Sequence, residues 1–154
     1  MRQRAVRSFP LLAVVLAGIA FSLSCAADDD PQTRTAVAPQ ALDAEVVAYY
    51  FHGNFRCKTC RAIEAYSEEA IRSGFVDELA SGRLAWRVVN VEQPENKHFV
   101  EDFELITRSL VLVEYRDGEV ARYENLKQVW QLVRDKERFL DYVHSSTREF
   151  LQGG

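Results

Sequence analysis

Four short apolar runs predict four β-strands. Residues 46–51 are almost continuously apolar, which is typical of a central strand covered on both faces. Residues 84–92 and 109–115 are rich in valine and leucine and predict two more strands, and residues 120–123 predict the fourth. Between the last two runs stands Asp117-Gly118, a pair that readily takes the positive φ angles of a tight reversal. These two strands are therefore predicted to form a hairpin.

Helical spacing of apolar residues appears between these runs. From Cys57 a stripe of apolar residues predicts a helix that breaks or bends at Ser73-Gly74 and stops at Ser81-Gly82. A short helix is predicted from Pro94 through Glu104, with proline in its first turn. The apolar positions that carry the two stripes are Ile63, Tyr66, Ala70, Ile71, Phe75, Val76, Leu79, Phe99, Val100 and Phe103.

A last helical region is predicted from Lys127, with Asp135 as an internal cap or bend. The element order is then βαβαββα. A strand joined to the next through a helix indicates parallel pairing, whereas the Asp-Gly hairpin indicates antiparallel pairing. The sequence therefore predicts an α/β fold with a mixed four-stranded sheet and flanking helices.

The first 25 residues have the pattern of an export signal. Three arginines precede an apolar stretch at 9–23, and small residues follow around Cys25. The stretch is shorter than the roughly 20 residues of a membrane-spanning helix. We predict a signal peptide at 1–25, a flexible tether at 26–43 and a domain at 44–150. Cys25 stands where a bacterial lipoprotein carries its lipid, and the alternative is ordinary cleavage beyond it.

Charge excludes one class of partner. The chain of 154 residues has a formal net charge of −4, and removal of residues 1–24 takes away three arginines and no acid. The exported chain is therefore more acidic still. A nucleic-acid partner would need a basic face, so none is expected. No glycine-rich phosphate loop is present, and no cofactor is expected.

Candidate chemistry lies in Cys57 and Cys60, at the predicted start of the first helix. Two cysteines three residues apart on a first helical turn can close into a disulfide, and the free N–H groups there stabilise a thiolate. Cys57 is expected to be the more exposed, attacking sulfur, with a pKa below the free value of about 8.5, and Cys60 the resolving one. Arg56, Lys58 and Arg61 surround the pair, either favouring the thiolate or serving solubility.

Two other uses of the same cysteines stay open. One is a permanent structural disulfide in an oxidising compartment. The other is a soft-metal site for Cu(I) or Zn(II), with His52 as a third ligand. His98 and His144 lie on predicted helices and are expected to face water.

The element order and the position of the dithiol resemble the thioredoxin fold over residues 44–147. More narrowly, the runs FHGNFRCKTC and SLVLVEYRDGE resemble the exported nitrophenyl compound nitroreductase subunit ArsF family. That resemblance implies electron delivery within a reductive system. Thioredoxins carry a tryptophan where this chain has Arg56, a buried aspartate where it has Phe51, and a cis-proline where counting back from the hairpin reaches Leu110. In thioredoxins that proline limits metal capture and orients the substrate backbone.

The sequence as a whole predicts an exported, thioredoxin-like thiol–disulfide redox protein, a possible thiol–disulfide oxidoreductase. Its partner would be another exported protein, and its contact with a membrane would run through a lipid on Cys25. The expected location is the periplasm or cell envelope.

Overall fold

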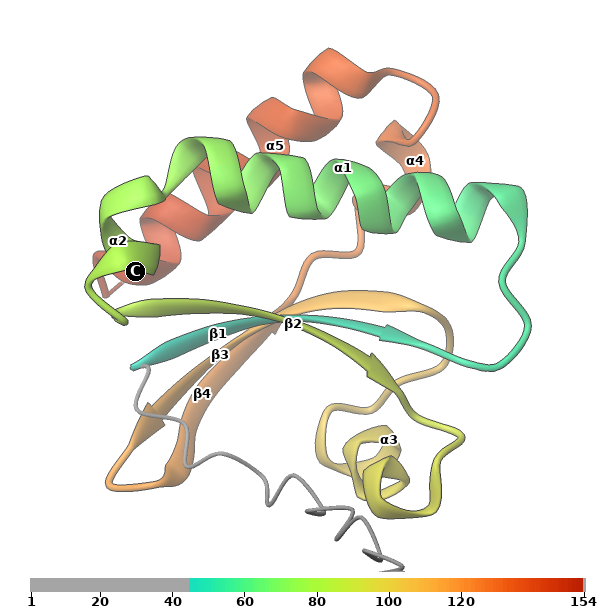
Figure 1. Ribbon diagram of the computed structural model, residues 1–154, viewed down its shortest axis with the longest axis horizontal. Helices are drawn as coiled ribbons and strands as arrows, with labels where there is room; N and C mark the ends of the chain where they lie inside the picture. The colour runs from blue at the N-terminus through green and yellow to red at the C-terminus, as the bar shows by residue number, and fades with distance from the viewer. Residues whose placement is uncertain (1–44, 154) are drawn as a thin grey trace, which may run out of the picture. The chain divides into compact units, whose positions relative to one another are not determined.

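A computed structural model describes residues 45–153 of the chain (Figure 1). The predicted signal peptide at 1–25, its candidate lipidation site Cys25 and the tether at 26–43 lie outside the described residues. So does residue 44, the predicted first residue of the domain. Export, cleavage and lipidation therefore stay predictions.

The predicted mixed sheet is confirmed. Its four strands are β1 (Val46–His52), β2 (Leu84–Asn90), β3 (Ser109–Arg116) and β4 (Glu119–Asn125), in the order β2-β1-β3-β4. β1 pairs in parallel with β2 and antiparallel with β3, and β3 pairs antiparallel with β4. Together with flanking helices, this order makes the fold α/β and thioredoxin-like.

Strand β1 is buried on both faces, as its continuous apolar run predicts. Alternate side chains point to opposite sides of a strand, so Val46, Ala48 and Tyr50 enter one core while Val47, Tyr49 and Phe51 enter the other. None of the six is more than 4% exposed. The sheet therefore divides two cores, and the segment that carries the cysteines follows a fully buried strand.

The helices are divided unequally between the two faces (Figure 1). On one face lie α1 (Lys58–Gly74), α2 (Val76–Ala80), α4 (Val129–Leu132) and α5 (Lys136–Leu151). The other face is covered by α3 (His98–Asp102), which follows a 3₁₀ turn at Pro94–Asn96. The long helices α1 and α5 pack against each other over the larger core, through Ile63, Ala70, Ile71, Phe139 and Val143.

Several predicted boundaries are corrected. The strand predicted at 84–92 ends at Asn90, and the helix predicted from Pro94 through Glu104 is a 3₁₀ turn followed by the five residues of α3. β4 runs on to Asn125, because pairing with β3 rather than apolar content sustains it. The last helical region is two helices, and the Asp135 side chain caps the second by accepting from the backbone N–H of Arg138.

The connection from β2 to β3 departs from the parallel rule although it contains a helix. β2 ends beside His52, and β3 begins opposite Phe51, at the same end of the sheet. The chain re-enters the sheet at the end it left, so β3 must run back and pair antiparallel with β1. The hairpin that follows is as predicted, with Asp117 at φ 54° and Gly118 at φ 82°.

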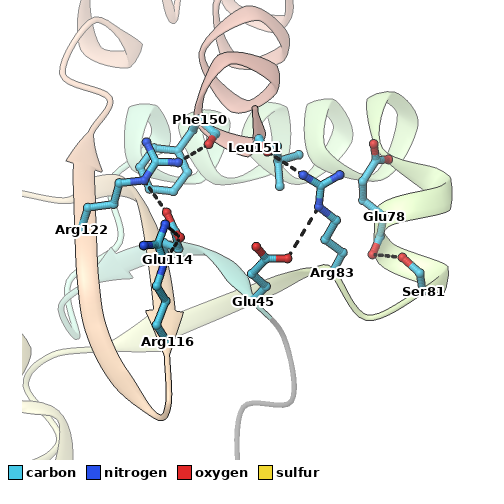
Figure 2. A network of polar contacts seen from close by, with 9 residues as sticks. All are labelled: Glu45, Glu78, Ser81, Arg83, Glu114, Arg116, Arg122, Phe150 and Leu151. Carbon is cyan, nitrogen blue, oxygen red and sulfur yellow. Dashed lines mark hydrogen bonds and ion pairs between the residues drawn. The ribbon is translucent and has the colours of Figure 1, made fainter. Parts of the chain in front are cut away.

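A polar network ties the C-terminal helix α5 to β3 and β4 (Figure 2). Glu114 on β3 is only 4% exposed, and both Arg116 and Arg122 donate to its carboxylate. Arg122 also donates to the Phe150 carbonyl and lies 4.1 Å from the centre of the Phe150 ring. The hydrogen bond from Arg122 is the main reason that the pKa of Glu114 lies below its ordinary value, although burial acts in the opposite direction.

A second arginine reinforces this end of the domain (Figure 2). Arg83, just before β2, donates to the Leu151 carbonyl at 2.6 Å and lies 3.7 Å from the Glu45 carboxylate. The last turn of α5 is thus joined to the residues just before β1 and β2.

Within residues 45–153, no helix is long and apolar enough to cross a membrane.

Candidate functional site: a dithiol at the start of α1

Cys57 and Cys60 form a disulfide at the end of the sheet opposite Glu114. Their Cα atoms are 5.1 Å apart, within the usual range for a bridge. Cys57 is the N-cap of α1, and its sulfur accepts a hydrogen bond from the Cys60 N–H at 3.1 Å. A thiolate at this sulfur would receive the same N–H and the positive end of the helix dipole. Cys57 is half-buried and Cys60 only 2% exposed, so Cys57 is the accessible sulfur.

The side chain beneath the disulfide is Tyr50. Its hydroxyl donates to the Cys60 carbonyl at 2.7 Å, which fixes the first turn of α1 to the central strand. Burial raises the pKa of Tyr50 to about 12, although the nearby charges of Arg56 and Arg108 act against that rise. Tyr50 is therefore a neutral hydrogen-bond donor at physiological pH. Phe51, the position compared with the thioredoxin aspartate, faces the other core and does not lie under the sulfurs.

The three cations next to the cysteines have different roles. Arg56 forms an ion pair with Glu64, a residue one helical turn beyond Cys60. The side chains of this pair are 27% and 20% exposed, so both charges are largely withdrawn from water. Lys58 and Arg61 are exposed. Glu64 thus neutralises part of the predicted positive charge around the cysteines. Of the three cations, only Lys58 and Arg61 remain available to an approaching molecule.

A loop from the start of β3 closes over the segment ahead of the cysteines. Arg108 donates to the Phe55 carbonyl at 2.9 Å, and its own carbonyl accepts from the Trp130 indole N–H at 2.8 Å. The loop thereby connects the segment just before Cys57 to α4. Two large apolar side chains stand out from these segments, Phe55 at 73% exposed and Ile106 at 98% exposed. Leu110, the position compared with the cis-proline, is fully buried in the core.

Two hollows are lined by residues just before Cys57 in the chain or between the two cysteines. One, of about 160 Å³, lies between the end of β1 and the loop, and is lined by His52, Gly53, Glu92, Ile106 and Arg108 among others. The second, of about 350 Å³, runs between the start of α1 and α4. Its lining residues are Lys58, Thr59, Ala62, Trp130, Val133 and Arg134. The two residues between the cysteines, Lys58 and Thr59, therefore both line the larger hollow.

The histidines do not build a metal site with the cysteines. His52 Nδ1 lies 2.9 Å from the Gly53 carbonyl, and its ring stacks near Tyr50. In the part of the chain that the structure describes, no group of three or more His, Cys, Asp and Glu side chains is placed to share a metal ion. His98 is exposed as expected. The expectation for His144 is wrong, because it is half-buried with Nε2 3.0 Å from the Ala70 carbonyl.

Sequence reasoning missed four residues of the site: Tyr50, Glu64, Arg108 and Trp130. Tyr50 offered a signal, because a tyrosine inside a buried strand requires a partner for its hydroxyl, and strand alternation assigns it to the α1 face. Glu64 lies four residues after Cys60, where a helical side chain points back toward the cysteine. Arg108 and Trp130 gave no local signal, because their contacts depend on how the loop and α4 meet.

No family model matches the chain, and no curated protein sequence matches it. Among the solved structures that resemble it in part are two thioredoxins and a malarial protein. A thioredoxin from Thermus thermophilus is 17% identical over 67% of this chain and 74% of its own, with a TM-score of 0.39. The oxidised thioredoxin from Plasmodium falciparum is 20% identical over 57% and 80%, with a TM-score of 0.35. A malarial protein is 12% identical over 52% and 79%, also at 0.35. The fold assignment stands on the strand order, and the narrower family stays a prediction.

Proposed function

We propose that this protein is an exported thiol–disulfide redox protein that exchanges electrons with another exported protein through Cys57 and Cys60. The observation that carries the proposal is the unequal burial of two bonded sulfurs at a helix start, with Cys57 accessible and Cys60 enclosed. This arrangement suits stepwise exchange, because one sulfur meets the partner and the other is kept for the second step.

In the reducing direction, the Cys57 thiolate attacks one sulfur of a partner disulfide. A mixed disulfide forms, and the other partner sulfur leaves as a thiolate. The Cys60 thiolate then attacks Cys57, closes the disulfide and releases the second partner thiolate. Two electrons pass to the partner, whose two sulfurs take up the two protons that the dithiol gives up. The reverse sequence oxidises a partner dithiol.

The surroundings support exchange with a protein. Exposed large apolar side chains mark contact surfaces when they gather around a functional group, and Phe55 and Ile106 belong to the two segments joined by Arg108 just ahead of Cys57. Tyr50 holds Cys60 in place from below. The resemblance to the ArsF family would make the chain an electron-delivering subunit.

The test is a redox titration. The purified protein is equilibrated in glutathione buffers of graded potential, its free thiols are alkylated, and mass spectrometry counts the alkyl groups. A cooperative two-electron transition within reach of the glutathione couple supports the proposal. A bridge that only strong reductants open would overturn it in favour of a static disulfide. Protection of both thiols by stoichiometric Cu(I) or Zn(II) would overturn it in favour of a metal-binding module.

Export and anchoring have a separate test. In a bacterial host, the wild type and Cys25→Ser are compared for processing and for partition between membrane and soluble fractions. A lipoprotein loses its lipid and its membrane association in the variant. Equal partition of both forms into the soluble fraction would show ordinary cleavage. Retention of an unprocessed chain in the cytoplasm would contradict export itself.

A further inference from the structure

The charged side chains that line the larger hollow beside the dithiol are all positive. Among its lining residues are two cations, Lys58 and Arg134, and no carboxylate. Trp130 and Val133 supply an apolar wall. Its volume of about 350 Å³ lies at the small end of the range of roughly 300–1,000 Å³ for ligand pockets. It can therefore hold a few side chains of an extended segment.

Neither of these two cations is engaged by a carboxylate of the described residues. Both side chains belong to exposed residues, and within residues 45–153 neither has an ion pair to a carboxylate within 4.0 Å. Of the fifteen Lys and Arg side chains in that range, six have such a pair: Arg56, Arg72, Arg83, Arg116, Arg122 and Lys136. Residues 45–154 hold more acidic than basic side chains. The larger hollow, called the groove below, is thus a cationic site on an acidic domain.

We infer that this groove binds an acidic segment of the partner protein, next to the partner's own reactive cysteine. The inference rests on the proposed function, since Lys58 stands between the two cysteines and any segment in the groove lies alongside them. Carboxylates would be attracted to Lys58 and Arg134, while the rest of the domain repels a partner of the same sign. Attraction at the groove combined with repulsion elsewhere both orients the partner and increases its rate of association.

The experiment uses three synthetic disulfide-linked peptide dimers with the same cysteine and flanking glycines. Their remaining residues are glutamate, glutamine or lysine. The protein is first reduced by dithiothreitol, which is then removed, and the release of peptide thiol is followed over time. We expect the glutamate peptide to react about tenfold faster than the glutamine peptide at low salt. The lysine peptide should be the slowest.

Salt separates steering from intrinsic reactivity. From about 0.01 M to about 1 M salt the Debye length falls from about 30 Å to about 3 Å, so the rates with the three peptides should converge. Equal rates at low salt, or a preference for the lysine peptide, would overturn the acidic-partner inference and leave the redox function intact. No reaction with any peptide would instead contradict the proposed function.

Matched variants locate the effect. Arg134→Gln should lower the ratio of the glutamate-peptide rate to the glutamine-peptide rate by about threefold, as one lost charge contact implies. Arg148→Gln makes the same change of charge on an exposed residue of α5 near its far end, and should leave that ratio unchanged. Equal effects of the two variants would show a response to net charge alone and overturn the groove assignment.

Binding without reaction provides a second readout. Trp130 lines the groove, whereas the only other tryptophan, Trp86, is 9% exposed in the core. Titration with the glutamate peptide carrying serine in place of cysteine should change the Trp130 fluorescence in a salt-sensitive manner. The change should be absent in Trp130→Phe. A signal that persists in that variant would place the peptide elsewhere.

Discussion

The two ends of the sheet differ in how far their cations are paired with carboxylates. At the Glu114 end, Arg83, Arg116 and Arg122 are all engaged by carboxylates, and two of them also donate to carbonyls of α5 (Figure 2). At the dithiol end, Arg56 is paired with Glu64, but Lys58 and Arg134 line an open groove and have no such pair within residues 45–153. One end uses arginine to hold helix to sheet. The other leaves cations and apolar side chains exposed, a choice that adds little to stability and suits contact with another molecule.

The sharpest way to break this comparison is to remove each sulfur in turn. Cys57→Ser should abolish exchange completely because no accessible nucleophile remains. Cys60→Ser should keep the attacking sulfur and accumulate a mixed disulfide, since the resolving step is lost. Mass spectrometry after mixing with a peptide disulfide measures both. Accumulation of the mixed species in Cys57→Ser instead would reverse the assigned roles.

At the opposite end the largest effect should fall on stability. Glu114→Ala removes a buried carboxylate and leaves two arginines without their partner, which should lower the free energy of unfolding by about 2 kcal/mol. Urea denaturation measures it. Glu124→Ala, an exposed change on β4, should stay within about 0.5 kcal/mol of the wild type. The Cys57 alkylation rate should be the same in all three proteins, and a change in Glu114→Ala would show that the two ends are coupled.

Acid should erase the same contribution. The pKa of Glu114 in the folded protein is lowered from 4.5, chiefly by the Arg122 bond. A lowered pKa gives stability that is complete above the unfolded value and is lost as the pH falls through the folded value. The difference in unfolding free energy between the wild type and Glu114→Gln should therefore shrink as the pH falls below 4.5. A constant difference down to low pH would argue against charge as its source.

A smaller effect is expected beneath the sulfurs. Tyr50→Phe removes the hydroxyl that holds the Cys60 carbonyl, and should cost about 1 kcal/mol of unfolding free energy. It should also make reduced Cys60 easier to alkylate. Tyr49→Phe is the matched control, since its hydroxyl meets Tyr115 on the other face of the sheet. Equal alkylation of Cys60 in both variants would limit Tyr50 to a structural role.

The finest difference concerns the neutralised cation. Glu64→Gln should free Arg56 from its ion pair and remove a negative charge from the vicinity of the sulfurs, so the thiolate forms more readily. The midpoint of the pH dependence of Cys57 alkylation should move to lower pH by about 0.5. Glu68→Gln, one turn further along α1 and paired with Arg72, should leave it in place. A midpoint that rises in Glu64→Gln would contradict this arrangement.

Local pattern was enough for the parts of the fold that local physics decides. The apolar run of β1 indicated burial on both faces, and Asp117-Gly118 indicated the hairpin. Polar Glu124 and Asn125 carried no strand signal, because their place in β4 comes from pairing with β3. His144 could not be assigned to the interior, since its contact with Ala70 depends on how α1 meets α5.

The candidate site divides along the same line. The spacing of Cys57 and Cys60 announced the disulfide, because both residues belong to one helical turn. The groove could not be predicted from the sequence, since Lys58 and Arg134 are 76 residues apart and only the fold brings both to one hollow. Its lack of carboxylates is likewise a property of the assembled surface.

The direction of β1 has a practical consequence. The described domain begins at Glu45, beside the Glu114 network, and the sulfurs follow the strand's other end. At about 3.3 Å per residue, the seven residues of β1 separate the two by more than 20 Å. A fluorophore, a bead or a fusion partner attached at Glu45 would therefore lie far from Cys57 and leave its sulfur accessible to a partner. The same attachment at the loop containing Ile106 would block it.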